Sequence, residues 1–179
     1  MTEAIEKFSV ILKKLDETML EQVRQWRNSP EVSRYMFTQD YISPEQQLAW
    51  FAKLQQDPSR LCFVVHFKGE AIGVANLTAP SGVNLADAPR IYTGFYLGSN
   101  RYRGTTLPFL PALALNDYCF SDLNCPELAA EVLNTNRAAI RFNQGLGYEI
   151  AEEKEGVTLM LLKPSEHQKA LQRMQRFIQ

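Results

Sequence analysis

A strand-like run followed by an arginine- and glycine-containing loop constrains the fold of this chain more than any other segment. Residues 91–97 are apolar and rich in β-forming residues, residues 98–106 are mostly polar, and residues 107–120 have the composition of a helix. A short loop between a strand and a helix N-terminus forms an anion site, because the first backbone N–H groups of a helix have no partner within it. This order predicts an anion-binding β–α turn in an α/β fold.

The loop carries the side chains that such a site needs. Arg101 and Arg103 can supply charged donors to a phosphate, and Gly104 lets the backbone approach the anion or adopt a positive φ. These residues predict that the loop binds a pyrophosphate group. An ordinary turn with solvated arginines is the alternative that the loop alone leaves open.

The composition argues against several classes of function. The 179 residues carry a formal net charge of −1, so no overall positive field would draw the chain onto nucleic acid or an acidic membrane. Cys62, Cys119 and Cys125 are odd in number and lack metal-ligand spacing, which favours reduced, buried thiols and predicts no metal site. Glu3 and Glu6 precede any apolar run, and no apolar segment is long enough to span a membrane. We therefore expect a cytoplasmic protein without nucleic-acid or membrane partners.

Hydrophobic periodicity and turn residues predict one α/β domain over residues 1–179, with a mixed, mostly antiparallel sheet flanked by helices. Its core would span about residues 8–163, and an additional C-terminal helix about residues 165–178. Strands are expected at 8–12, 61–67, 70–78, 91–97, 128–133, 148–151 and 157–162. Helices are expected at 17–28, 31–36, 107–120 and 136–147, and from Ser43 to about Asp57.

The helix that begins at Ser43 carries the clearest local signals. Ser43 and Gln46 have the spacing of a capping box, in which each side chain binds the backbone N–H of the other residue. Leu48, Phe51 and Leu54 recur at helical spacing and are expected to form its buried stripe.

Two stretches resemble the acyl-CoA-binding motifs of the GNAT superfamily, the acetyl-CoA-dependent N-acetyltransferases. The family's loop pattern is Gln/Arg-x-x-Gly-x-Gly/Ala between a strand and a helix, and residues 101–106 read Arg-Tyr-Arg-Gly-Thr-Thr. Residues 136–148 are similar to the family segment Asn-x-x-Ala-Ile-x-x-Tyr-x-x-x-Gly-Phe, which implies a helix along the pantetheine arm. The resemblance implies a GNAT fold, acetyl-CoA as cosubstrate, and a cofactor site made of Leu97, Arg101, Arg103, Gly104, Thr105, Thr106, Asn136, Ala139 and Phe142.

Several positions depart from the family pattern. Thr106 stands where the family has Gly or Ala, and Pro108 and Pro111 crowd the start of the next helix, which Pro111 is expected to kink. Asn143 stands where the family has the tyrosine that protonates the departing thiolate. Asparagine can donate a hydrogen bond but is no general acid, a difference worth about 10²–10⁴-fold in rate. We therefore expect transfer that is slowed, with Asn143 as a hydrogen-bond donor to the sulfur.

The N-terminal third narrows the resemblance to the pseudaminic-acid-pathway transferases, which acetylate the 4-amino group of a UDP-linked aminosugar. Residues 26–36 read Trp-Arg-Asn-Ser-Pro-Glu-Val-Ser-Arg-Tyr-Met, and residues 48–51 read Leu-Ala-Trp-Phe. The resemblance implies a small-molecule amine acceptor, a nucleotide sugar, bound by Arg27, Asn28, Met36 and Asn76. The alternative is that side chains of this region only close the edge of the domain. The sequence also leaves open whether the chain forms a homodimer.

No carboxylate occurs in the strand pair 73–78 and 91–97, where related enzymes place a base. Thr78, Asn76 and Tyr92 are the polar side chains there, and we expect them to orient the amine while solvent accepts its proton. Simple alternation of polar positions along a strand is the competing interpretation for Thr78 and Asn76. Other classes stay open: an acetyltransferase for a protein N-terminus or a small amine, a CoA-binding regulatory protein, and a structural α/β protein.

Overall fold

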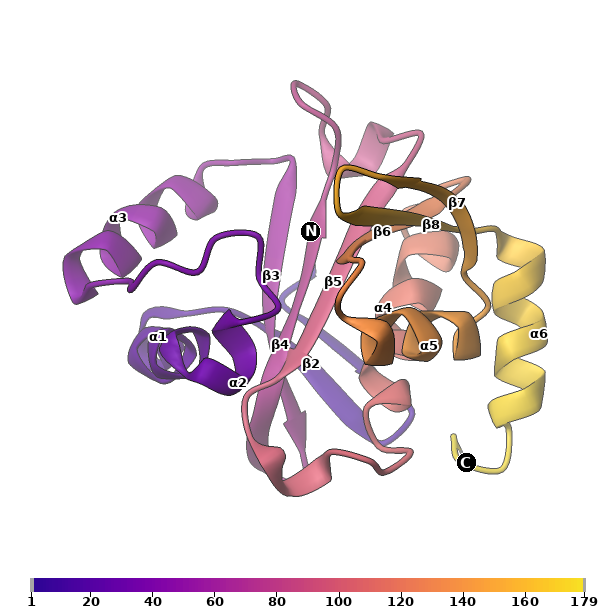
Figure 1. The fold of residues 1–179 in the computed structure, drawn as a ribbon, viewed down its shortest axis with the longest axis horizontal. Helices are drawn as coiled ribbons and strands as arrows, with labels where there is room; N and C mark the ends of the chain where they lie inside the picture. The colour runs from indigo at the N-terminus through magenta and orange to yellow at the C-terminus, as the bar shows by residue number, and fades with distance from the viewer. Residues whose placement is uncertain (1, 179) are drawn as a thin grey trace.

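The computed structural model describes residues 2–178, which form an eight-stranded sheet with helices on both faces (Figure 1). The strands are β1 (Ala4–Lys7), β2 (Val10–Lys14), β3 (Arg60–Phe67), β4 (Glu70–Thr78), β5 (Ile91–Leu97), β6 (Leu128–Leu133), β7 (Glu149–Lys154) and β8 (Val157–Leu162). The helices are α1 (Leu20–Asn28), α2 (Pro30–Ser33), α3 (Pro44–Gln55), α4 (Phe109–Ser121), α5 (Arg137–Gly145) and α6 (Pro164–Met174).

The strand order is β1-β2-β3-β4-β5-β6-β8-β7, and among the described strands only the β5–β6 pair is parallel. This confirms the predicted α/β class with a mostly antiparallel sheet and a C-terminal helix. β5 and β6 share a short register, Ile91 opposite Leu128 and Tyr92 opposite Ala129, and then separate. Within residues 2–178 the β5 backbone from residue 93 to 97 therefore has no strand partner on its β6 side.

Two layers of helices cover the sheet. Helices α1, α2 and α3 lie on one face, and α4, α5 and α6 lie on the other (Figure 1). Alternating side chains of β4 supply both cores, because successive residues of a strand point to opposite faces: Ala75 joins the larger cluster beneath α4, and Val74 joins the smaller one with Val23 of α1. No helix in residues 2–178 has the length and apolar character that crossing a membrane would require.

The strand predicted at 8–12 is correct for residues 10–12, which belong to β2, and wrong for Phe8 and Ser9. The segment is a hairpin in which β1 and β2 are antiparallel, and Lys7 pairs with Val10 across a two-residue turn. Phe8 and Ser9 form that turn with φ values of 54° and 64°. Positive φ at both positions matches the twist of a hairpin, but Gly and Asn are the residues that normally signal such a turn. Neither is present here, so the pattern of apolar residues concealed the turn.

The capping box of α3 is confirmed, because Ser43 and Gln46 exchange hydrogen bonds of 2.8 and 3.2 Å between side chain and backbone. The buried stripe predicted for this helix is wrong at Leu48, which is 58% exposed. Gln47 is buried instead, and its Nε2 donates to the carbonyl of Leu20 in α1 at 3.4 Å. A polar side chain that is buried for a backbone acceptor on another helix has no signal in hydrophobic periodicity.

Helix α4 accommodates both of its prolines in the region where they cost least. Pro108 is the N-cap and Pro111 is the third helical residue, so both lie where backbone N–H groups have no partner within the helix. The N–H that Pro111 lacks therefore leaves no helical hydrogen bond unmade. The kink expected at Pro111 therefore has no cause, and α4 continues to Ser121.

A buried ionisable group attaches helix α6 to the rest of the fold. His167 is fully buried, and its Nε2 lies 3.1 Å from Oδ1 of Asp117 in α4, whose other carboxylate oxygen pairs with Lys7 Nζ. A neutral ring can donate to Asp117 only from Nε2–H, which leaves Nδ1 without a partner in the described chain. Burial lowers the pKa of His167, whereas for Asp117 the bonds from Lys7 and His167 outweigh burial and lower its pKa.

Acidification from pH 7 to pH 5 should destabilise the fold through His167. Histidine in the unfolded chain has a pKa of about 6.5. Because burial lowers the folded-state pKa, the unfolded chain takes up the proton first, and stability is lost as pH falls below that value. In thermal melts at constant ionic strength, His167→Gln should flatten the decline in Tm across this window. His66→Gln is the control for losing an imidazole, and an unchanged slope in His167→Gln would contradict the prediction.

Candidate active site

The predicted anion loop leads from Leu97, the last residue of β5, toward α4. Ser99 Oγ accepts a hydrogen bond from the backbone N–H of Arg101 at 3.2 Å, and a 3-10 turn over Asn100–Tyr102 follows. Gly104 has a φ of +74°, a conformation that other residues adopt only with strain. A Cβ at this position would meet nothing within 4 Å, so the backbone conformation and not crowding explains the glycine.

Both arginines of the loop are exposed. Arg101 Nη1 donates to Glu70 Oε2 at 2.6 Å, but an exposed ion pair of this kind is weak and can be exchanged for another anion. No salt bridge within residues 2–178 involves Arg103. The loop can therefore turn two guanidinium groups toward a phosphate with little loss of existing contacts.

The loop backbone has donors that the fold does not use. Thr105 Oγ1 donates to the carbonyl of Tyr102 at 2.7 Å, so its hydroxyl already closes the turn. The N–H groups of Gly104 and Thr106 donate to no acceptor in residues 2–178. Backbone N–H groups that point to solvent beside a helix start are suited to an anion. Five of the predicted cofactor residues thus lie together in one exposed loop: Arg101, Arg103, Gly104, Thr105 and Thr106.

Aromatic side chains line the place where β5 leaves β6. Phe142 of α5 stacks on Phe109 of α4 with ring centroids 4.6 Å apart, and on Phe95 of β5 at 6.4 Å. Asn136 is the N-cap of α5, and its Oδ1 accepts from the N–H of Ala139 at 3.2 Å. Asn136 thus starts the helix that carries Ala139 and Phe142, and this helix packs beside the open edge of β5.

Asn143, the predicted hydrogen-bond donor to the sulfur, is half-buried in α5, and its backbone carbonyl accepts from the N–H of Tyr148 at 3.0 Å. Tyr148 is the nearest tyrosine along the chain, but its hydroxyl bonds to Thr93 Oγ1 at 2.7 Å and Asn116 Oδ1 at 3.1 Å. Burial raises the pKa of Tyr148, so this phenol holds its proton. Tyr148 is therefore a structural bridge at the point where β5 leaves β6 and no substitute for the family's acid.

A cavity of about 610 Å³ lies on the other face of the sheet, among α1, α3, the segment 38–42 and strands β3 to β5. Three of the predicted site residues line it: Arg27, Asn76 and Thr78. The rest of the lining consists of residues outside the predicted site, although the sequence marks Tyr41 as an aromatic group suited to an acceptor: Val23, Thr38, Asp40, Tyr41, Ile42, Gln46, Gln47, Trp50, Leu54, Arg60, Leu61, Cys62, Val74, Leu77 and Tyr96. These residues share only their place in the fold, because the packing of α3 against α1 creates the cavity that they line.

Arg27 is the cavity residue with an unmet hydrogen-bonding need. Its Nη2 donates to the carbonyl of Thr38 at 2.8 Å, while its buried Nη1 has no partner within residues 2–178. Burial lowers the pKa of Arg27, although the group stays charged because arginine titrates far above neutrality. An unpartnered, charged donor in a desolvated place is costly unless a ligand supplies the acceptor.

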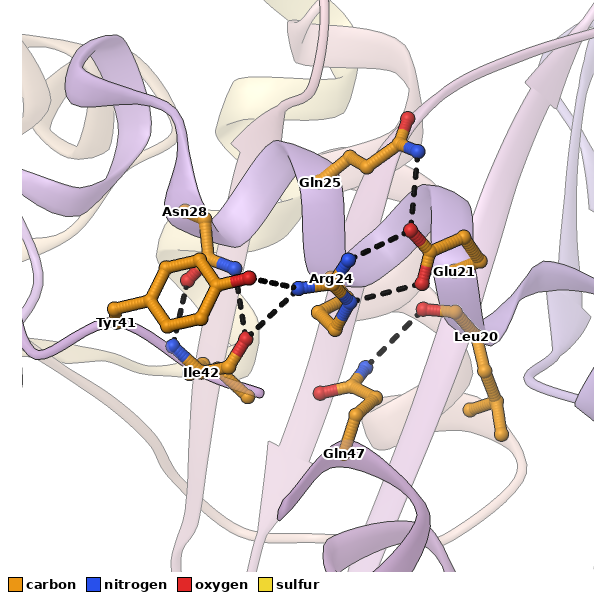
Figure 2. Close-up of polar contacts among 8 residues, drawn as sticks. All are labelled: Leu20, Glu21, Arg24, Gln25, Asn28, Tyr41, Ile42 and Gln47. Atoms are coloured by element: carbon orange, nitrogen blue, oxygen red, sulfur yellow. Dashed lines mark hydrogen bonds and ion pairs between the residues drawn. The ribbon is translucent and has the colours of Figure 1, made fainter. Parts of the chain in front are cut away.

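Asn28, the neighbour of Arg27, has its side chain committed to the protein. Its Nδ2 donates to the carbonyl of Ile42 at 2.9 Å and its Oδ1 accepts from the N–H of Ile42 at 2.8 Å (Figure 2). Met36 is half-buried and is not part of the cavity wall. Binding of an acceptor by Asn28 and Met36 stays a prediction, and the structure gives Asn28 a positioning role.

The three residues predicted to orient the amine lie on neighbouring strands. Thr78 of β4 is directly opposite Tyr92 of β5, and Asn76 is opposite Gly94. A Cβ at Gly94 would lie 2.7 Å from Asn76 Oδ1, so the glycine makes room for the amide.

The described residues contain no group of three or more His, Cys, Asp or Glu that could hold a metal ion.

The fold and the β5 loop define an acyltransferase of the GNAT type. The family model "Acetyltransferase (GNAT) domain" matches residues 9–149, and the chain belongs to this family. The resemblance noted in the sequence is confirmed, and the chain is an acetyltransferase of a family for which acetyl-CoA is the typical cosubstrate.

Several relatives are similar over most of the chain. Acetyltransferase PseH of Campylobacter jejuni strain 81-176 is 28% identical over 85% of this chain and 90% of its own, and the spermidine N(1)-acetyltransferase of Escherichia coli K12 is 30% identical over 81% and 75%. A crystal structure of Campylobacter jejuni PseH with acetyl coenzyme A has a TM-score of 0.66 at 22% identity, covering 87% of this chain and 99% of that one. Apo FdhC, a nucleotide-linked sugar GNAT, has a TM-score of 0.79 at 14% identity and 100% coverage of both chains.

Acetyl-CoA should stabilise the folded protein through the β5 loop. At about 100 times its Kd, a ligand that binds only the native state adds about 2.7 kcal/mol, which a thermal melt detects as a rise in Tm. Gly104→Val should remove most of this rise, because a β-branched residue is strained at a φ of +74°. Gly82→Val is the matched control, since Gly82 also has a positive φ and open surroundings but lies outside the loop. An unchanged Tm of the wild type with saturating acetyl-CoA would contradict the site.

Asn143→Ala should lower turnover modestly if the amide donates a hydrogen bond to the thioester sulfur. Asn143→Tyr would restore the family's acid and is expected to raise kcat, by up to the 10²–10⁴-fold that proton transfer contributes. The measurement is kcat by thiol release at saturating acetyl-CoA. Equal rates in Asn143→Ala and the wild type would show that the side chain has no part in catalysis.

Proposed function

We propose that the protein transfers an acetyl group from acetyl-CoA to the amino group of a nucleotide-linked sugar. The observation that carries this proposal is the buried, unpartnered Nη1 of Arg27 in the wall of the cavity. Two arginines, Arg27 and Arg60, face this cavity against a single carboxylate, Asp40. A lining with this balance favours an acceptor that carries negative charge, such as a nucleoside diphosphate.

The proposed cofactor site uses the loop and the open strand edge. Arg101, Arg103 and the N–H groups of Gly104 and Thr106 would bind the pyrophosphate of CoA. The unpaired backbone of β5 beyond Tyr92 would bind the amide groups of the pantetheine arm. The stacking of Phe142 on Phe109 would hold α5 beside that arm.

The transfer needs a neutral amine in line with the thioester carbonyl. The amine lone pair forms a bond to the carbonyl carbon, the carbon–sulfur bond breaks, and the sulfur leaves as CoA thiolate. Asn76, Thr78 and Tyr92 would orient the amine, and because no carboxylate lies among them, solvent would take its proton. Asn143 would donate a hydrogen bond to the sulfur as charge develops there.

A polyamine is the second candidate acceptor, because a relative at 30% identity is a spermidine acetyltransferase. A polycation gains affinity from carboxylates, whereas this cavity has one carboxylate and two guanidinium groups. We therefore rank the nucleotide-linked sugar first, in agreement with the likeness to PseH and to FdhC.

Arg27→Ala should raise the acceptor KM severalfold or more while the acetyl-CoA KM stays nearly unchanged. The reason is that Arg27 lines the acceptor cavity and is on the face of the sheet opposite to α4 and α5. The measurement is acetyl transfer to UDP-, GDP- and dTDP-linked aminosugars, with spermidine alongside.

Arg34→Ala is the matched control, because Arg34 is an exposed arginine outside the cavity wall. Equal losses for both substrates would indicate a folding defect. Turnover of spermidine in preference to every nucleotide-linked aminosugar would overturn the proposed acceptor.

A further inference from the structure

Tyr41 is held in a fixed place although most of its side chain faces solvent. It is 69% exposed, more than any other large hydrophobic side chain in the described residues, and it belongs to the wall of the acceptor cavity. A tyrosine at a surface usually keeps its rotamer freedom, because burial does not compensate for ordering it. The contacts that order Tyr41 therefore need an explanation.

Arg24 supplies those contacts from α1. Its Nη1 donates to the Tyr41 hydroxyl at 2.9 Å and to the carbonyl of Ile42 at 3.0 Å, and its guanidinium carbon lies 5.8 Å from the ring centroid (Figure 2). The Arg24 side chain is only 12% exposed, and Glu21 binds its Nε and Nη2 at 2.8 and 2.7 Å. These bonds lower the pKa of Glu21 to about 2, so the carboxylate stays charged at neutral pH.

The wall around Tyr41 is fixed at two further points. Asn28 binds both backbone groups of Ile42, and Arg27 binds the carbonyl of Thr38. The segment 38–42 is thus tied to α1 by three side chains, while the ring of Tyr41 remains exposed. A ring that is ordered before a ligand arrives spares the ligand the entropy cost of ordering it.

We propose that the Tyr41 ring stacks on the planar base of the nucleotide-linked acceptor, and that Arg24 is the positioning residue that fixes the ring for this purpose. The inference rests on the proposed function and deepens it. Arg27 lies in the same wall and binds the carbonyl three residues before Tyr41. A phosphate at Arg27 and a base at Tyr41 would therefore be held by one rigid segment.

A purely structural role for Tyr41 would depend on a different part of the side chain than stacking does. If Tyr41 only ties the segment 38–42 to α1, its hydroxyl matters and its ring does not. If Tyr41 stacks on a base, the ring matters most, and Tyr41→Phe should lose only the small part of the affinity that the hydroxyl bond to Arg24 contributes by ordering the ring. The two substitutions Tyr41→Phe and Tyr41→Ala therefore separate the two roles.

The experiment measures binding of UDP, GDP and dTDP to the full chain by calorimetry, with ribose 5-diphosphate as a probe that lacks the base. Tyr41→Ala should weaken UDP or GDP binding roughly fivefold to a hundredfold, the range for loss of one base–aromatic stack. Its affinity for ribose 5-diphosphate should stay within about twofold, and Tyr41→Phe should stay within about threefold of the wild type for every probe. Arg24→Lys should weaken UDP or GDP binding by about the same small factor as Tyr41→Phe and leave ribose 5-diphosphate unaffected, because both substitutions loosen the ring without removing it.

Phe37→Ala is the matched control, because Phe37 is an aromatic residue 60% exposed in the same part of the chain and is not part of the cavity wall. Acetyl-CoA binding and the circular dichroism spectrum show that each variant is folded. Equal weakening by Tyr41→Phe and Tyr41→Ala, equal loss for ribose 5-diphosphate, or no effect of Tyr41→Ala would each overturn the stacking role alone. Failure of the wild type to bind UDP, GDP or dTDP would overturn the proposed acceptor, and the stacking role with it.

Discussion

The separation of β5 from β6 is the constraint on which the rest of the structure depends. The two parallel strands share their register only as far as Tyr92 and Ala129, and from there β5 keeps its ladder to β4 alone within the described chain. Unpaired backbone groups inside a fold are costly unless another group satisfies them. The helices that follow these strands, α4 and α5, then pack beside the gap through Phe109 and Phe142. The gap and the exposed loop after β5 are together the features expected of a site for a long, amide-containing cofactor.

The same strand separates two chemically different surfaces. Side chains alternate along a strand, so Phe95 points to the aromatic contacts of α5 while Tyr96 lines the cavity toward α1 and α3 with its two arginines. Asn76 and Thr78 of β4 share that cavity. An acyl donor bound along the edge and an acceptor bound in the cavity can thus meet at the β4–β5 pair. This arrangement explains why few residues near the proposed reaction need to be ionisable, since positioning supplies much of the rate.

Three polar residues near the end of α1, Arg24, Arg27 and Asn28, make different contacts. Arg24 binds Glu21, Tyr41 and Ile42, Asn28 binds Ile42 through both ends of its amide, and Arg27 has a buried Nη1 without a partner in residues 2–178. The sequence placed Arg27 and Asn28 together as substrate residues, but neighbouring residues on a helix point in different directions. Their partners, Thr38 and Ile42, are 11 and 14 residues away and belong to a segment without regular structure, so no periodicity could have revealed which side chain keeps an unpartnered atom.

Local chemistry let the sequence determine most strands and helices, the capping box of α3, the glycine turn at Gly104 and the family itself, because each depends on residues close together in the chain. Where the deciding contact was distant, the sequence was silent or wrong. The hairpin at Phe8–Ser9 lacks the usual turn residues and is held by strand pairing. Gln47 is buried in place of Leu48 because its side chain donates to a backbone carbonyl of α1. The cavity, its excess of guanidinium groups and the fixed ring of Tyr41 exist only where α1, α3 and the segment 38–42 meet. Tertiary structure decided these features because hydrogen-bond partners and burial depend on which surfaces the fold brings together.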